Sequence, residues 1–140
     1  MLVRGYETEQ FKPLLKEWAK LAKVPMTKFD VEIHRAKGSP SGSFLRDKHK
    51  IWTMITEDPW LFRRTSLITV YFNLDEMENN KYVFLHELGH LKQYRDKRWK
   101  IKGHRKLAEK RATEFALSLG CKPTARYRGM KDARWKSNKK

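Results

Sequence analysis

The chain has 140 residues, of which 39% are hydrophobic and 12% aromatic, so it holds enough apolar material for one folded domain and is not a disordered chain. Its formal net charge of +16 is uneven: residues 1–91 hold 14 Lys or Arg and 12 Asp or Glu, whereas residues 92–140 hold 18 and 4, a net of +14. No apolar run approaches the roughly 20 residues that span a bilayer, and the sequence does not start with the apolar segment of a secretion signal. We therefore expect no membrane partner. The single cysteine, Cys121, cannot form an internal disulfide, which favours a cytoplasmic protein.

The first elements in chain order are a helix and a strand. Residues Glu7–Val24 carry apolar side chains at intervals of three and four, which predicts an amphipathic helix that ends at Pro25. Pro13 fits this helix only within its first turn, where a missing N–H is tolerated. Residues Phe29–Ala36 alternate between apolar and polar side chains, which is typical of a half-buried strand.

The middle of the chain predicts a loop and two extended segments. The composition of residues Gly38–Ser43, which read GSPSGS, predicts a loop. Residues Phe44–Thr56 are expected to be extended, and the β-branched and aromatic residues of Ser66–Leu74 predict a strand.

Two helices are expected to follow. The first runs from about Lys81 to Arg98 with Asn79 or Asn80 as its cap, and the second from about Gly103 to Leu119, ended by Gly120.

The order of these elements predicts an α+β fold in which the helices lie on one side of a small sheet of about three strands. We expect a single domain over residues 1–121 and a basic C-terminal tail over residues 122–140.

The segment HELGH, residues 86–90, suits a metal site on the first of these helices. His86 and His90 are four residues apart, so on a helix both imidazoles can converge on one cation. Two neutral imidazoles leave Zn²⁺ with enough charge to bring the pKa of a bound water to about 7. Glu87 projects to the side of the histidines, where it can act as a general base without ligating the metal.

A surface helix with two solvated histidines is the alternative interpretation of HELGH. Residues Val83–Leu91 contain no charge other than Glu87, although 34% of the chain is charged, and a solvated helix face would not have that composition. Gly89 leaves room for another backbone to come close to this helix.

A catalytic zinc site needs a third protein ligand. Glu109 lies at the edge of the buried stripe expected for the second helix, and small alanines beside it favour a close approach of the two helices. Glu114 lies on the far side of that helix, where a solvated carboxylate is expected. His104, 14 residues after His90, remains an alternative third ligand, since SprT-like repair proteases use a third histidine.

The combination of H-E-x-x-H with a second helix reading E-x-x-A-x-x-F-A resembles the gluzincin metallopeptidases. The likeness is to soluble minigluzincins and to the catalytic domain of the CAAX-prenyl-protease/HtpX group. This resemblance implies a zincin-like fold, one catalytic Zn²⁺ held by His86, His90 and Glu109, and Glu87 as the general base. The implied function is a zinc-dependent endopeptidase that hydrolyses peptide or protein substrates through a zinc-bound water activated by Glu87.

The sequence departs from the group at three points. The group often has Asp or Asn, which orients a ligand, at the position that Thr113 occupies here, and the consensus has an apolar residue where this chain has Lys92. The membrane-spanning helices of the prenyl-protease group are absent, which favours the minigluzincin type.

In the resembled fold a peptide substrate adds as an extra strand to the sheet beside the cleft. Either the strand that ends near Thr56 or the Ser66–Leu74 strand is a candidate for this role. Tyr94, His104, Arg126 and Tyr127 are candidates to stabilise the oxyanion, and no spacing selects one of them.

The basic C-terminal part allows three hypotheses. It is a solubilising tail, an inhibitory segment that folds back into the cleft of a latent enzyme, or a nucleic-acid-binding region. In the last case the protein is a DNA-directed protease or a DNA-binding module on a zincin scaffold. In the latent state Cys121 is a candidate zinc ligand, although a buried structural thiol is the simpler role.

Overall fold

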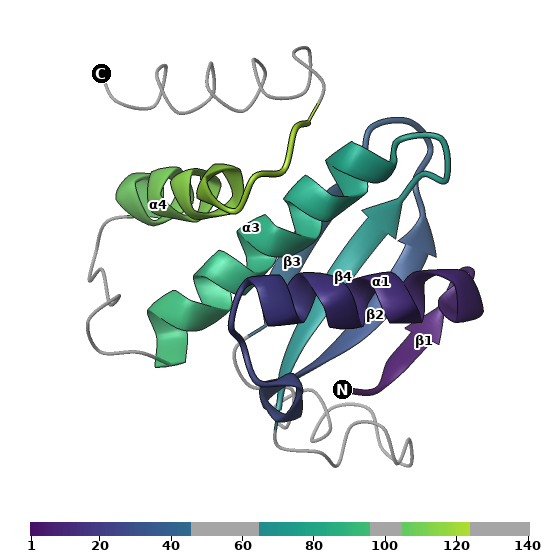
Figure 1. The fold of residues 1–140 in the computed structure, drawn as a ribbon, viewed down its shortest axis with the longest axis horizontal. Coiled ribbons are helices and arrows are strands. Elements are labelled where there is room, and N and C mark those ends of the chain that lie inside the picture. Colours follow the sequence, from purple (N-terminus) through teal and green to yellow (C-terminus); the bar gives the residue numbers. More distant parts are fainter. Residues whose placement is uncertain (46–64, 96–104, 124–140) are drawn as a thin grey trace.

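The computed structural model describes residues 1–45, 65–95 and 105–123. Within these ranges the fold is α+β, with three α-helices and a four-stranded mixed sheet (Figure 1). The predicted α+β class is therefore confirmed, and the sheet has one strand more than the three or so expected. The additional strand is β1 (Val3–Gly5), whose three residues are too few to produce a periodic pattern.

The sheet combines β1 with β2 (Phe29–Arg35), β3 (Ser41–Leu45) and β4 (Ser66–Phe72) in the order β1-β2-β4-β3. The strands β1, β2 and β4 run parallel, whereas β3 runs antiparallel to β4. In this order β4 lies inside the sheet with a neighbour on each side, and β3 forms one edge. In the described part of the chain no strand pairs with the outer side of β3.

The predicted Gly38–Ser43 loop is partly wrong, because its last three residues begin β3. Gly and Ser have low strand propensity, but the ladder to β4 and the close contact of Gly42 with a helix outweigh it. The predicted extended segment Phe44–Thr56 enters the described residues only at its first two positions, both in β3. The rest of that segment lies outside the described residues.

Helix α1 (Thr8–Leu21) is the predicted amphipathic helix, and the short 3-10 helix η1 (Met26–Lys28) follows it. The expectation that Pro13 lies in the first turn is wrong, since it lies farther inside α1. Pro13 is exposed, so water can bond the carbonyl that would otherwise accept its missing N–H.

Helix α3 (Met77–Arg95) starts four residues earlier than predicted, and Asn79 and Asn80 are buried inside it instead of capping it. The side chain of Asn80 accepts a hydrogen bond from the backbone N–H of Asn73 at 3.0 Å and donates one to its carbonyl at 2.8 Å. This pair ties the chain that leaves β4 to the first turn of α3.

Helix α4 (Arg105–Ser118) corresponds to the second predicted C-terminal helix. It is followed by Gly120, which has a φ of 83°, a left-handed conformation that glycine adopts at low cost after a helix. The predicted basic tail lies outside the described residues after Pro123.

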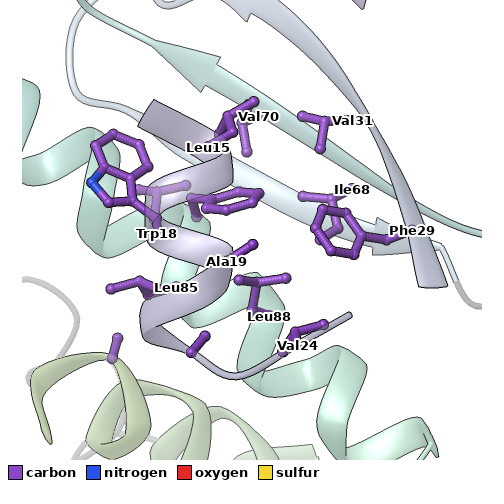
Figure 2. Packing of buried hydrophobic residues seen from close by; sticks show 14 of the residues in the cluster. Leu15, Trp18, Ala19, Val24, Phe29, Val31, Ile68, Val70, Leu85 and Leu88 are labelled. Atoms are coloured by element: carbon purple, nitrogen blue, oxygen red, sulfur yellow. The ribbon is translucent and has the colours of Figure 1, made fainter. Parts of the chain in front are cut away.

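The core lies between the sheet and the pair of helices α1 and α3, which cover the same face (Figure 1). Phe84 of α3 contacts Phe29 of β2 at 6.0 Å and Trp18 of α1 at 6.1 Å between ring centroids. Figure 2 shows the side chains of α1 and α3 meeting those of β2 and β4 in one apolar layer. Helix α4 packs against α3 and adds Ala116 to this core, so α3 is covered from several sides. No helix in the described residues is long and apolar enough to cross a membrane.

Candidate metal centre

The motif residues lie in the middle of α3, where the helix is buried from Tyr82 to Gly89. His86 and Glu87 are each 5% exposed, and His90 is half-buried. Each of the three side chains offers one ligand atom, and these atoms lie within 4.8 Å of one another. Polar groups are rarely buried in this way without partners or a ligand, so the cluster is a candidate metal centre.

Glu109 of α4 reaches both histidines. Its Oε2 lies 2.8 Å from Nε2 of His86, and its Oε1 lies 3.2 Å from Nε2 of His90. The two imidazole rings stand edge to face, with centroids 4.9 Å apart. The fold therefore brings together Nε2 of each histidine and a carboxylate from a second helix, which are the three residues that the resemblance implied as ligands.

Glu114 and His104 are the other two residues considered as the third ligand, and within the described residues neither of them is found at the histidines. The side chain of Glu114 is 59% exposed and lies 3.8 Å from Lys110, one turn earlier on α4, so it is the solvated carboxylate that the sequence predicted. His104 lies outside the described residues.

A close contact between α3 and α4 allows Glu109 to reach the histidines. A Cβ on Gly89 would lie 3.1 Å from Cα of Ala112 and 3.3 Å from a ring carbon of Phe115. The prediction that Gly89 admits a neighbouring backbone is confirmed, and the expected role of the small residues of α4 is confirmed at Ala112. Lys92, where an apolar residue was expected, places its ammonium 5.0 Å from the centroid of the Phe115 ring.

The carboxylate of Glu109 and the two imidazoles stabilise one another's charged forms. Burial by itself would raise the pKa of Glu109, but its contacts with His86 and His90 outweigh burial and hold that pKa far below its ordinary value. Burial by itself would lower the pKa of His90, but its contact with Glu109 and the nearby charge of Glu87 raise it. The centre is thus an ionised carboxylate between two imidazoles, which can exchange a proton for a metal cation.

The ring nitrogens that face away from Glu109 also have partners. Nδ1 of His86 lies 3.3 Å from Oγ1 of Thr113, which accepts a hydrogen bond at 3.3 Å from the hydroxyl of Tyr82. Nδ1 of His90 lies 3.0 Å from the side-chain oxygen of Gln93. Thr113 therefore contacts His86, a candidate ligand, from the position where the resembled group has Asp or Asn. Sequence reasoning missed Tyr82 and Gln93, although Gln93 lies one helical turn after His90 and shares its side of the helix.

Sequence reasoning also missed Gly42, which we expected in a loop. A Cβ on Gly42 would lie 3.1 Å from Cγ of Glu87 and 3.0 Å from a methyl group of Val83. The edge strand β3 therefore passes directly over Glu87, and a larger residue at position 42 would force the neighbouring side chains to give way by a few tenths of an ångström.

The donor set fits zinc. Two imidazole nitrogens and one carboxylate are a common set of protein ligands for a catalytic zinc ion, which keeps its fourth position open. In such sites the second nitrogen of each histidine is hydrogen-bonded, as it is here.

No protein-family model, curated protein or solved structure matches this chain. The likeness to gluzincins therefore rests on the motif residues themselves.

Proposed function

We propose that the protein is a zinc-dependent metallopeptidase of gluzincin type, with His86, His90 and Glu109 as zinc ligands. The observation that carries this proposal is the Glu109 carboxylate, which contacts Nε2 of both histidines from a separate helix. A chance H-E-x-x-H on a helix would not come with a carboxylate that faces both imidazoles across a close helix contact.

Bound zinc would polarise the scissile carbonyl and acidify the attacking water. Glu87 is suited to take the proton from that water, because its carboxylate lies beside the imidazoles and the residue is buried. It would then pass the proton to the leaving amine as the peptide bond breaks. Tyr94 is the one candidate for oxyanion stabilisation within the described residues.

The substrate class follows from the sheet edge. An extended peptide bonds an edge strand through its backbone, which tolerates many side-chain sequences. Of the two strands considered from the sequence, β4 is excluded, because β2 and β3 occupy both its sides. The other, expected to end near Thr56, is described only at its first two residues, which belong to β3. No strand pairs with the outer edge of β3 in the described residues, and Gly42 places this edge directly beside Glu87. We propose that an unfolded or extended protein segment pairs with β3 and is cleaved there.

The hypotheses on the basic tail, inhibition of a latent enzyme and nucleic-acid binding, concern residues that lie almost entirely outside the described ones. They remain proposals from the charge distribution alone. Cys121 lies within the described residues as a buried thiol that donates to the carbonyl of Ala116 at 2.8 Å.

The substitution Glu87→Gln tests the proposed activity, because it removes the base while preserving the size of the side chain. We expect the variant to bind zinc as the wild type does and to cleave an unstructured protein such as casein about 10²–10⁴-fold more slowly. Glu17→Gln on the exposed side of α1 is the matched control and should leave cleavage unchanged.

Zinc content and the rate of casein cleavage should be measured on the same samples. If zinc-loaded wild type and Glu87→Gln proteins cleave at the same rate, or neither cleaves any substrate of a degenerate peptide library, the peptidase proposal is wrong. Retained zinc without turnover would indicate a domain that the metal only stabilises.

A further inference from the structure

Gln93 is a buried amide at the contact of α3 with α4, and its exposed fraction is 8%. Its side chain makes two hydrogen bonds in different directions. The amide nitrogen donates to the backbone carbonyl of Ala108 at 2.9 Å, and the amide oxygen lies 3.0 Å from Nδ1 of His90. The side chain of Gln93 therefore joins His90 on α3 to Ala108 on α4. Ala108 directly precedes Glu109, the candidate ligand on that helix.

The contact with Ala108 determines which way the amide points. A backbone carbonyl can only accept a hydrogen bond, so the NH₂ group of Gln93 faces Ala108 and its oxygen faces His90. An amide oxygen likewise only accepts, so Nδ1 of His90 carries a proton and donates it. The nitrogen left to bind a metal is Nε2, which is the nitrogen that faces Glu109.

We propose that Gln93 is a positioning residue of the metal centre, which holds the His90 ring with Nε2 toward the metal and keeps α4 in register so that Glu109 reaches the same point. This inference rests on the zinc site of the proposed function and adds the residue that arranges it. The bond to Nδ1 fixes the ring orientation, and the bond to Ala108 couples that orientation to the position of the third ligand.

The surroundings restrain the two histidine rings differently. The hydrogen bond with Gln93 therefore matters more for the orientation of His90 than the contact with Thr113 does for that of His86. His86 is 5% exposed and is enclosed by Tyr82 and Thr113, so packing also restrains its ring. His90 is more exposed, and Gln93 is the neighbour that hydrogen-bonds its Nδ1 among the described contacts. Loss of such a contact to a ligand histidine typically lowers metal affinity 10–100-fold.

Two substitutions separate the two bonds of Gln93. Gln93→Leu removes both bonds at similar size, while the carbonyl of Ala108 keeps its partner within the helix. Gln93→Glu keeps an acceptor for Nδ1 of His90 but cannot donate to Ala108 when ionised. Gln10→Leu is the matched control, because Gln10 is the other glutamine of the chain and lies exposed on α1.

Zinc affinity should be measured for all four proteins by competition with a chromophoric chelator, and the stability of the metal-free proteins by urea unfolding. We expect Gln93→Leu to bind zinc about 10–100-fold more weakly than wild type. Gln93→Glu should recover at least half of that loss on a logarithmic scale, and Gln10→Leu should match wild type. In proton NMR of the zinc-loaded proteins, the Nδ1 proton of His90 should exchange slowly in wild type and fast in Gln93→Leu.

Equal zinc affinity in wild type and Gln93→Leu would overturn the inference, and the proposed zinc site would stand. A Gln93→Glu variant that binds zinc as weakly as Gln93→Leu would also overturn it, because the effect would then come from the bond to Ala108 alone. Absence of zinc binding by the wild type would instead overturn the proposed function on which the inference rests.

Discussion

Helix α3 meets two different environments on its two sides. Toward α1 and the strands β2 and β4 it presents large apolar side chains such as Phe84 and Leu88, which are fully buried in the main core. Toward α4 and β3 it presents His86, Glu87 and Gly89, which contact a carboxylate, the edge strand and a second helix at close range. The first side holds the fold together through apolar area, and the second holds a chemical site through a small number of directed contacts.

This difference indicates that stability and the proposed metal binding depend on separate sets of residues. The core side contributes by non-directional burial, so its substitutions should change the free energy of unfolding. The site side depends on the position of α4 relative to α3, so small displacements there should change metal affinity more than stability.

Removal of the aromatic ring at position 84 gives the largest expected change in stability. Phe84 is fully buried between Trp18 and Phe29, so Phe84→Ala leaves a cavity and should lower the free energy of unfolding by about 3–5 kcal/mol. Urea unfolding of the metal-free protein measures this loss. A loss below about 1 kcal/mol would contradict the assignment of this side of α3 to the core.

The substitution Gly89→Val tests the contact between α3 and α4. Its side chain would collide with Ala112 and Phe115, which should cost about 1–3 kcal/mol of stability and move Glu109 away from the histidines. We therefore expect zinc affinity to fall about 10-fold or more, as for other changes around a ligand set. Unchanged affinity in a chelator competition assay would mean that the helix contact does not place Glu109.

The smallest expected change in the free energy of unfolding comes from the thiol of Cys121, and it appears only at alkaline pH. Burial raises the pKa of its thiol to about 11, so the folded protein binds this proton more tightly than the unfolded chain. The resulting stabilisation is complete below the ordinary thiol pKa of 9.0 and is lost as the pH rises toward 11.

The control for this effect is Cys121→Ala, which cannot ionise. The difference in unfolding free energy between wild type and variant should shrink as the pH is raised from 8 to 11. A difference that stays constant over this range would show that the thiol titrates normally in the folded protein.

Much of the fold could be predicted from the sequence, because α1 and β2 carry clear periodic patterns, β4 is rich in β-branched and aromatic residues, and Gly120 indicates the end of α4. The strand β3 could not be predicted, since Ser41 to Ser43 gain strand structure only from pairing with β4 and packing on α3. The early start of α3 was missed for a related reason: Asn80 resembles a helix cap, but its amide is used to bond Asn73.

In the site, the motif spacing predicted that His86 and His90 share a face of a helix, and the pattern around Gly89 predicted a close neighbour. The direction of Glu109 depends on how α4 packs, which no local pattern determines. The contact of Gln93 with His90 lies within one turn of α3, so the spacing of the two residues in the sequence indicated it. The contacts of Gln93 with Ala108 and of Gly42 with Glu87 join elements distant in sequence, and single-sequence periodicity contains no information on them.

The most direct test of the metal centre is the zinc content of the purified protein and of three variants, measured by elemental analysis after dialysis against a weak chelator. We expect one zinc ion per chain in the wild type. Glu109→Ala should lose the metal, whereas Glu114→Ala, an exposed glutamate of the same helix, and His104→Ala should retain it. A wild-type protein without zinc, or full zinc in Glu109→Ala with loss in His104→Ala, would contradict the site described here.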